Sequence, residues 1–350
     1  MKNSITIGMD LGDKKHTVCV LGAEGDVIDR REISNTRQGI ERLMSKYAEA
    51  LVVMESGTHS PWISRFMEAG GCRVLVGNPR KLRAIWARTN KSDATDAEML
   101  ARIGRLDPNL LYPIHHRSEQ AQRDLAQIKG RDVLVQSRSA LINHVRCIAK
   151  SLGERMPSSS TDAFPRRARA SLSEELEGVV APILAAIEEL SLQIKAYDER
   201  IVALSVAGYP EAERLQQVPG VGPITSLAFV LTIEEPGRFQ KSRSVGAFMG
   251  MTSRRDQSGE TDRQLRITKA GDRYVRQLLV SSAHYILGPF GPECDLRRFG
   301  MKLMKRGGKN AKRRAVVAVA RKLAVLLHRL WVTGATYDPD YNRRSERQAA

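Results

Sequence analysis

Four carboxylates stand where a metal-dependent site for chemistry on phosphodiesters could form. Asp10 ends the apolar run ITIGMD, and Glu55 ends a second one, LVVME. Asp93 and Asp96 follow in KSDATDAEML and share one face if a helix already includes both. Carboxylate oxygens are ligands that Mg²⁺ prefers, and two such ions about 4 Å apart assist phosphodiester cleavage. We therefore expect these four acids to hold Mg²⁺ for chemistry on nucleic acid.

The two later acids have a second interpretation. Thr95 with Glu98 has the spacing of a capping box, so Asp96 could merely complement the dipole of a helix that starts here. Asp10 shifts the balance toward a site, because a carboxylate among apolar strand residues is costly unless it has a function. His16, in the next strand, could face the same site, although we expect it to face solvent.

A second group of residues could supply a nucleophile. Ser258 lies in DQSGE among arginines, which could stabilise a pentacoordinate phosphate during attack by the serine hydroxyl. Ser-Gly is also common in turns, so the residues alone favour a turn serine. Several basic residues around and after it fit phosphate contacts as well as a solvated surface. They are Arg254, Arg255, Arg263, Arg266, Lys269, Arg273 and Arg276.

The elements that must position the acids follow the order βββαβαβ and then a helix. A strand over 4–11 precedes a hairpin that turns at Gly25, a helix over 36–50, the strand LVVM, a helix opened by Pro61, and the strand CRVLVGN. Three adjacent antiparallel strands would result. This order predicts an α/β domain over residues 1–117 of the RNase H-like kind, a mixed sheet with helices on its faces.

Two long helical segments come next, over residues 118–206. Apolar positions spaced by three and four predict one helix over 118–152 and a second opened by Pro182, with a flexible loop over 153–172 between them. We predict that they form an antiparallel coiled coil that projects from the sheet domain and offers a dimer contact. A helical hairpin packed within one monomer is the alternative.

Residues 207–335 are predicted to form a mainly helical domain. The stretch VPGVGPITS joins two apolar segments as in a helix-hairpin-helix, where the amides around Gly220 and Gly222 suit a phosphate. Between Arg297 and Arg314 there are nine basic residues and no acid, and an apolar helix follows. Residues 336–350 read as a polar tail.

The composition points to a polyanionic partner. Lys and Arg number 56 against 39 Asp and Glu, a formal charge of +17, which favours phosphate contacts and counterion release. A ribosomal or membrane-surface protein would carry a similar charge. Four scattered cysteines indicate neither a disulfide framework nor a Cys-type zinc site. Without a signal peptide or an apolar run long enough for a membrane span, we expect a cytoplasmic protein.

Together these motifs resemble one family. GMDLGDKKH, VVMESGTHSPW, NKSDATDAEMLA, VPGVGPITS and FMGMTSRRDQSGETDRQLRITKAGDRYVRQLLV resemble, in this order, the transposases of the insertion-sequence one-ten group. The resemblance implies a RuvC-like N-terminal domain, a coiled-coil middle and a C-terminal transposase domain. It also implies that the four acids form the metal-binding DEDD set and that Ser258 holds one DNA end as a phosphoserine. Gln257 stands where the family often has a second serine, so Ser253 remains a rival.

The same resemblance implies excision and insertion by strand exchange on double-stranded DNA, through a Holliday-junction-like intermediate. It further implies dimers that pair into tetramers in a bacterial cytoplasm, at the nucleoid, and in some members guidance by a bridge RNA. A metal-dependent junction resolvase or nuclease without serine chemistry is the alternative enzyme. A non-catalytic nucleic-acid-binding protein is a third reading, which the acids disfavour because negative charge facing phosphate weakens binding.

Overall fold

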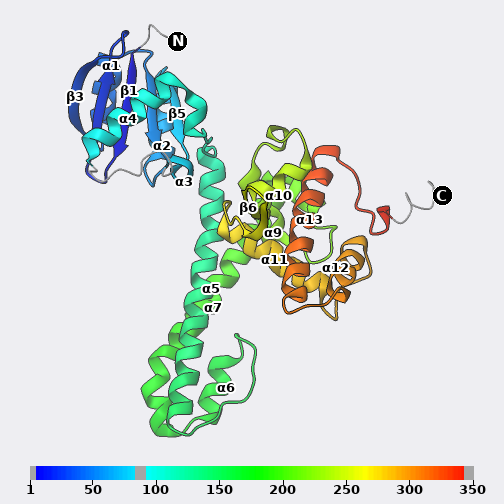
Figure 1. Cartoon of the computed structure of the whole chain (residues 1–350). Coiled ribbons are helices and arrows are strands. Elements are labelled where there is room, and N and C mark those ends of the chain that lie inside the picture. Colours follow the sequence, from blue (N-terminus) through cyan, green and yellow to red (C-terminus); the bar gives the residue numbers. More distant parts are fainter. Residues whose placement is uncertain (1–4, 83–91, 343–350) are drawn as a thin grey trace, which may run out of the picture. The chain divides into compact units, whose positions relative to one another are not determined.

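The computed structural model describes residues 5–82 and 92–342 of the chain, drawn in Figure 1. The chain divides into two compact units, Met1–Glu119 and Gln120–Ala350. The division differs from the three domains expected from sequence in that the long helices belong mainly to the second unit. The expected strand start at Ser4 and the end of the polar tail, 343–350, lie outside the described residues.

A five-stranded mixed sheet forms the centre of the first unit, in the order β3-β2-β1-β4-β5. The first three strands are antiparallel, whereas β4 runs parallel to β1 and β5 runs parallel to β4. The α/β class and the three adjacent antiparallel strands are thereby confirmed. The strand bounds are Thr6–Leu11 (β1), Lys15–Leu21 (β2), Val27–Ser34 (β3), Leu51–Glu55 (β4) and Arg73–Gly77 (β5).

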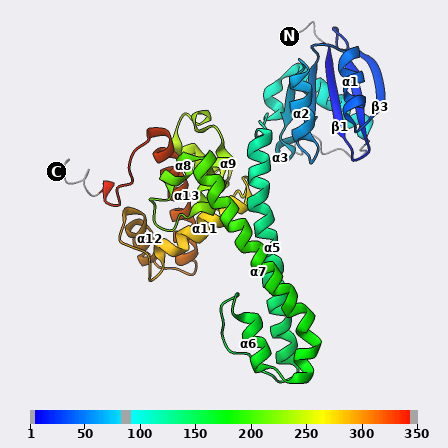
Figure 2. The same ribbon diagram turned by 180° about the vertical axis from the view of Figure 1, so that it is seen from behind.

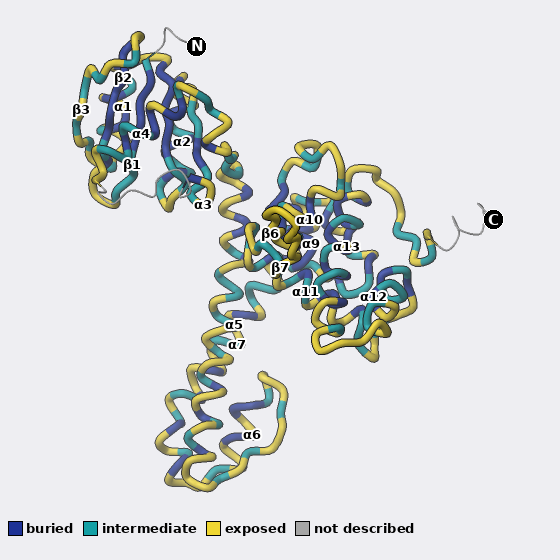
Figure 3. The backbone as a smooth tube through the Cα atoms, in the orientation of Figure 1, coloured by how far each residue is buried: buried dark blue, intermediate teal, exposed yellow. Residues whose placement is uncertain are grey.

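Helices cover both faces of this sheet. The α1 helix (Arg37–Lys46) and α2 (Ser60–Ala69) pack on the face that carries Ile7 and Met9. The α4 helix (Asp93–Leu106) packs on the other face. The tube in Figure 3 shows the result, with buried backbone along the central strands. The short α3 (Pro79–Leu82) and η1 (Pro108–Leu111) complete the unit.

The α4 helix lies close against β1 because Gly8 has no side chain. A Cβ at Gly8 would stand 1.9 Å from the carbonyl oxygen of Ala97 and 2.7 Å from the amide nitrogen of Ala101. Both are backbone atoms of a helix and cannot rotate away. The glycine therefore sets the distance between α4 and the sheet, and with it the position of the acids at the start of α4.

Gly8→Ala is expected to push α4 away from the sheet and to lower the free energy of unfolding by about 2–3 kcal/mol, the usual cost of overpacking. Denaturant unfolding measures this loss. Gly57→Ala is the matched control, because a Cβ there meets no atom within 4 Å. Its stability should stay within about 0.5 kcal/mol of wild type. A Gly8→Ala protein as stable as the control would contradict the close packing of α4.

Two long helices of the second unit, α5 (Glu119–Ser151) and α7 (Glu174–Gly208), pair in antiparallel fashion (Figure 2). Arg131 of α5 donates a hydrogen bond to Asp198 of α7, and Arg138 of α5 donates one to Ser191 of α7 at 3.0 Å. A later residue of α5 therefore contacts an earlier residue of α7, as expected for antiparallel helices. Further along, apolar side chains of both helices form a shared cluster. Arg138 interrupts the apolar stripe, but its side chain is only 11% exposed and its guanidinium donates a hydrogen bond to Asp162.

Two predicted boundaries in this hairpin are wrong. The α7 helix does not open at Pro182 but at Glu174, where the Ser173 hydroxyl accepts a hydrogen bond from the Leu176 amide at 3.3 Å. The cap and the buried residues of the first turns outweigh the hydrogen bond that an internal proline removes. The segment 153–172 is also not only loop, because it contains α6 (Phe164–Ser171), whose Phe164 is fully buried against the long helices.

The rest of the second unit is mainly helical around one large core. Its most buried element is α9, which is apolar on all sides, as expected for a helix surrounded by others. An exposed hairpin of β6 (Ser253–Ser258) and β7 (Thr261–Ile267) was not predicted. In the ranges that the structure describes, no helix is long and apolar enough to span a membrane. The helices are α8 (Pro210–Leu215), α9 (Pro223–Ile233), α10 (Val245–Phe248), α11 (Arg273–Leu287), α12 (Asp295–Lys305) and α13 (Ala311–Thr333).

Candidate active site and nucleic-acid interface

Asp10 and Glu55 occupy equivalent positions at the ends of neighbouring parallel strands. The register of β1 and β4 pairs Met9 with Met54, so the residues that follow stand side by side. Adjacent strands lie about 4.8 Å apart, which brings the two carboxylates within reach of one cation. Both residues are half-buried. The parallel pairing thus joins two acids that are far apart in the sequence.

Both carboxylates lie on the sheet face that α4 covers. Strand residues alternate between faces, and Gly8 and Val53, each two residues before an acid, contact α4. The later residues Arg102 and Arg105 of α4 donate to carbonyls of the β2–β3 turn, at the opposite end of the sheet. The first turn of α4 therefore lies over the strand ends that carry the acids.

The start of α4 is capped by Ser92. Its hydroxyl accepts a hydrogen bond from the Thr95 amide at 3.3 Å, so the alternative in which Thr95 and Glu98 form a capping box is wrong. Glu98 instead pairs with Arg30 of β3 and with Arg102 of α4. The hydrogen bond from Arg102 lowers the pKa of the Glu98 carboxyl most strongly. The Glu98 carboxylate is therefore paired with these arginines and does not cap the start of α4.

The four acids match a hard divalent cation in ligand type, since all offer carboxylate oxygens. The sheet register brings Asp10 and Glu55 together, and the first turn of α4 adds Asp96, half-buried, and Asp93, exposed. Across residues 5–82 and 92–342, no three His, Cys, Asp or Glu side chains are gathered closely enough to hold a metal ion. The backbone thus places the donors in one region, but their side chains do not form a coordination shell.

His16 faces neither solvent nor the acids. Its side chain is completely buried, which corrects the expected solvent-facing position. It pairs with Leu11, so it lies on the sheet face opposite to Asp10. Asn35 donates its amide to the Asp13 carbonyl, and its side-chain oxygen accepts from His16 Nε2 at 3.1 Å. Burial lowers the pKa of His16. This histidine therefore belongs to the core of the first unit.

Ser258 lies at the exposed tip of the hairpin in the second unit. It ends β6 and pairs with Thr261 across a tight turn, in which Gly259 has φ +54°. All residues of β6 are exposed, so the Ser258 side chain is open to solvent. The rival Ser253 is also exposed but pairs with Ile267 at the base of the hairpin. This position agrees with the interpretation of Ser258 as a turn residue. It does not test the interpretation of Ser258 as a nucleophile.

The arginines of this hairpin differ in their surroundings. Arg254, Arg263 and Arg266 are exposed on the strands. Arg255 forms a two-pronged pair with Asp262 at 2.7 and 2.5 Å, which raises the pKa of Arg255 and lowers that of Asp262. An exposed pair of this kind adds little stability, but it offsets one positive charge on the hairpin.

Arg276 contacts protein carbonyls. Its Nη1 donates to the carbonyl oxygens of Met249 and Gly271, each at 3.1 Å. Met249 precedes the hairpin and Gly271 follows it, so one guanidinium ties both ends of the hairpin to α11. The Lys269 amide adds a bond to the Gly250 carbonyl at 2.9 Å. These contacts indicate that Arg276 holds the hairpin in place, a role that the sequence pattern did not reveal.

Lys269 and Arg273 do not share a helix. Lys269 has φ +54° and precedes α11, which begins at Arg273 after the capping residue Asp272. Both basic residues are exposed. Asp272 accepts from the amides of Tyr274 and Val275 at 2.8 and 3.1 Å. The segment between hairpin and helix is therefore a tight connection with basic residues at both ends.

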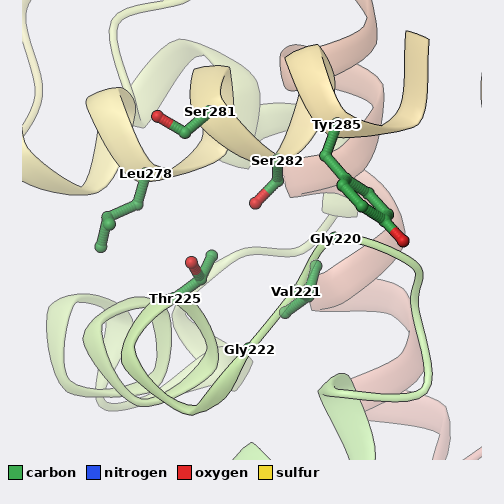
Figure 4. Close-up of a pocket in the computed structure, with 8 residues that line it drawn as sticks. All are labelled: Gly220, Val221, Gly222, Thr225, Leu278, Ser281, Ser282 and Tyr285. Atoms are coloured by element: carbon green, nitrogen blue, oxygen red, sulfur yellow. The ribbon is translucent and has the colours of Figure 1, made fainter. Parts of the chain in front are cut away.

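The predicted helix-hairpin-helix turn lies between α8 and α9. Gly220 has φ +79°, and Gly222 occupies the N-cap position of α9. An open cavity of about 450 Å³ separates this turn from α11 (Figure 4), and Thr225, Ser282 and Tyr285 are among the residues that line it. The sequence singled out the two glycines but missed the contribution of α11.

Two family models of transposases match this chain. The family model for the DEDD domain of IS110 elements, described as "Transposase", matches residues 7–152, which include all four acids. A second model, described as "Transposase IS116/IS110/IS902 family", matches residues 212–293, which include the turn at 220–222 and the hairpin. The first model spans nearly all of the first unit and the start of the second, and the second model matches part of the second unit.

Curated relatives extend the similarity over nearly the whole chain. The transposase for insertion sequence element IS1111A of Coxiella burnetii is 27% identical over 345 residues, covering 96% of this chain and 92% of the relative. A probable family 20 transposase of Pseudomonas aeruginosa is 27% identical, covering 96% and 99%. A putative transposase, y4pF/y4sB, of Sinorhizobium fredii is 27% identical, covering 99% and 87%. The chain therefore belongs to the IS110 family of transposases and is a DNA transposase/recombinase.

Proposed function

We propose that this transposase excises and inserts its insertion sequence by cleaving and exchanging DNA strands, with a Mg²⁺-binding carboxylate site and a serine nucleophile. The observation that carries the proposal is the parallel register that sets Asp10 and Glu55 side by side beneath the first turn of α4. The sheet order and the helices on both faces suit an RNase H-like domain of the RuvC kind.

In this proposal Asp10, Glu55, Asp93 and Asp96 hold the metal. Mg²⁺ bound there would supply charge stabilisation for the attacking and leaving oxygens. Gly8 keeps the α4 backbone close to β1, and the proposal requires the α4 carboxylates to approach the Asp10 and Glu55 pair when the metal binds.

Ser258 is the proposed nucleophile. Its Oγ attacks a backbone phosphorus, the bond from phosphorus to the leaving deoxyribose oxygen breaks, and that oxygen takes up the proton that the serine loses. One DNA end then remains on Ser258 as a phosphoserine. The exposed Arg254, Arg263 and Arg266 stabilise the charge on the pentacoordinate phosphate. Attack by the released hydroxyl of another strand on this ester reverses the step and exchanges the strands.

We further propose that dimers pair into tetramers through the long helices, and that a bridge RNA contributes to target choice at the nucleoid. Apolar side chains stand exposed on α5 and α7, with Val133 60%, Val179 68% and Leu192 64% accessible, as expected for helices that meet a second copy. The formal charge of +17 suits simultaneous contact with DNA and RNA.

A metal-dependent junction resolvase or nuclease is the second candidate function. It is favoured by one observation, the position of Ser258 directly before a tight turn, where serine is common for structural reasons. A denaturing gel distinguishes the two. Purified protein with Mg²⁺, junction DNA of its own element and RNA transcribed from the flanks should yield a covalent protein–DNA adduct. Cleaved DNA without an adduct would favour the nuclease.

Arg276→Met is expected to slow adduct formation about 10- to 100-fold, because the hairpin that carries Ser258 loses the bonds at both its ends, and small displacements of a reacting group are costly. The apolar stem is kept, so α11 should remain folded. DNA affinity, measured by fluorescence anisotropy, should change less than about threefold.

Arg273→Met provides the contrast, because Arg273 is exposed at the start of α11. Loss of a phosphate contact should weaken DNA binding and reduce the dependence of affinity on salt by about one unit of log–log slope, with the adduct rate at saturating DNA unchanged. If Arg276→Met behaved like Arg273→Met, Arg276 would be a phosphate contact after all.

A further inference from the structure

The turn that follows Glu55 is held by a buried hydroxyl. The β4 strand ends at Glu55, and beyond it the Ser60 hydroxyl accepts a hydrogen bond from the Gly57 amide at 3.0 Å and donates one to the Gly57 carbonyl at 2.9 Å. Ser60 is fully buried and is the first residue of α2. One hydroxyl therefore binds both backbone groups of the residue that stands two positions after Glu55.

Gly57 depends on these bonds for its conformation. A Cβ at Gly57 would meet no atom of the described chain within 4 Å, so packing does not confine this residue. Glycine also has more backbone freedom than any other residue. On the strand side, the Ser56 amide donates to the Gly77 carbonyl at 3.0 Å, which continues the pairing of β4 with β5. The path of the chain just after Glu55 is thus set by hydrogen bonds on both sides.

His116 holds the Ser60 hydroxyl in turn. Its Nε2 lies 2.9 Å from Ser60 Oγ. A hydroxyl has one proton and two acceptor positions, and Gly57 takes the proton and one of these positions, so Nε2 is the donor of the third bond. Burial lowers the pKa of His116, and the nearby Arg65 and Arg117 lower it further. The ring is therefore neutral at pH 7, with its proton on Nε2.

The backbone on both sides of His116 is fixed to the first unit. The Ile114 amide donates to the Val76 carbonyl of β5 at 2.9 Å. Arg65 of α2 donates from Nη1 to the Arg117 carbonyl at 2.8 Å. His116 is half-buried between these two anchors. The imidazole therefore presents its Nε2 proton to Ser60 from a fixed position.

We propose that His116 and Ser60 are positioning residues that hold the end of β4, and with it the Glu55 carboxylate, in place for the metal. His116 fixes the hydroxyl of Ser60, and that hydroxyl fixes the turn at Gly57. Groups that orient a metal ligand without touching the metal affect metal affinity. The inference deepens the proposed function and rests on it, because it takes Glu55 as a ligand of Mg²⁺.

Ser60→Ala is the first test, because it removes a single oxygen atom. Melting temperatures of DNA-free protein at rising Mg²⁺ concentrations give the Kd for the metal, since only the folded protein binds it. We expect this Kd to rise about three- to tenfold, because the turn after Glu55 is held less firmly. A wild-type Kd in Ser60→Ala would overturn the proposal.

His116→Leu and His116→Gln separate the hydrogen bond from the space that the ring fills. His116→Leu removes the donor and should weaken Mg²⁺ binding as Ser60→Ala does. Glutamine offers an amide N–H near the position of Nε2, so His116→Gln should bring the Kd to within about twofold of wild type. His115→Leu is the matched control, because this neighbouring histidine is exposed, and it should bind Mg²⁺ like wild type. Equal losses in both His116 variants would refute the hydrogen-bond role.

The double variant tests whether the two residues act in series. Ser60→Ala combined with His116→Leu should bind Mg²⁺ no more weakly than Ser60→Ala alone, because His116 acts through the Ser60 hydroxyl. Losses in affinity that multiply would show that the two residues act independently, which would contradict the proposed order of contacts.

Asp10→Asn shows which proposal has failed. If Mg²⁺ stabilises wild type but not Asp10→Asn, the carboxylate site stands whatever the positioning variants show. An unchanged Kd in Ser60→Ala would then refute the positioning role alone. If Mg²⁺ does not stabilise wild type, the carboxylate site fails, and the positioning role fails with it.

Discussion

Asp10→Asn is expected to reduce DNA cleavage by at least about 1,000-fold while DNA binding stays as tight as in wild type or becomes tighter. The amide keeps the size of the side chain but removes a charged metal ligand. It also removes a negative charge from a surface that must approach phosphate. A rate assay with saturating DNA and Mg²⁺, paired with a binding assay, measures both effects.

Thermal stability gives a readout that does not depend on activity. A cation that binds only the folded protein raises its melting temperature. Mg²⁺ should therefore stabilise wild type and have little effect on Asp10→Asn.

Glu32→Gln is the matched control for this experiment. Glu32 lies on the edge strand β3, is exposed, and pairs with Lys15 at 2.7 Å. It should keep both cleavage and the Mg²⁺-dependent gain in melting temperature. An Asp10→Asn protein that recombines at the wild-type rate would exclude the carboxylate site as the metal centre.

The sheet of the first unit could be predicted because its signals are local. Alternation, the glycine turn of the hairpin and Pro61 at the start of α2 each depend on a few neighbouring residues, and the structure has strands and helices in that order. The pairing of Asp10 with Glu55 needed one further step, the parallel register, which the strand order implied. The sequence was thus enough to predict that these two acids end neighbouring strands.

The errors arose where two local signals competed or where tertiary contacts decided. Ser92 and Thr95 are both good caps, and only the structure shows that Ser92 is used. Pro182 looked like a helix start, but packing carries α7 through it. His16 alternates like an exposed strand residue, yet it is covered by groups from other segments. None of these outcomes can be read from a short window of sequence.

The hairpin around Ser258 was missed for a different reason. Its strands are polar and arginine-rich, with no apolar face, so the usual alternation is absent. The sequence did contain one signal of a hairpin, the turn sequence Ser-Gly-Glu between two polar segments of similar length. In the structure, Gly259 of this turn has a positive φ. Arg276 could not have been assigned at all, because its partners are carbonyls at both ends of that hairpin.

Ser258→Ala is expected to abolish the covalent protein–DNA adduct and to lower strand exchange by at least about 1,000-fold, since the variant lacks the hydroxyl that is proposed to carry the DNA end. The side chain is exposed, so the free energy of unfolding should change by less than about 0.5 kcal/mol. The Mg²⁺-dependent gain in melting temperature should persist, because the acids lie in the other unit.

Ser253→Ala decides between the two serines. Both are exposed on β6, but Ser253 pairs at the base of the hairpin and Ser258 at its tip, so only the tip variant should lose the adduct. Mass spectrometry of a protease-treated adduct would locate the attached nucleotide on Ser258. An adduct that survives Ser258→Ala and disappears in Ser253→Ala would move the nucleophile to the base of the hairpin. Cleavage that survives both variants but requires Asp10 would leave the carboxylates as the whole catalytic site and make the protein a metal-dependent nuclease in its chemistry.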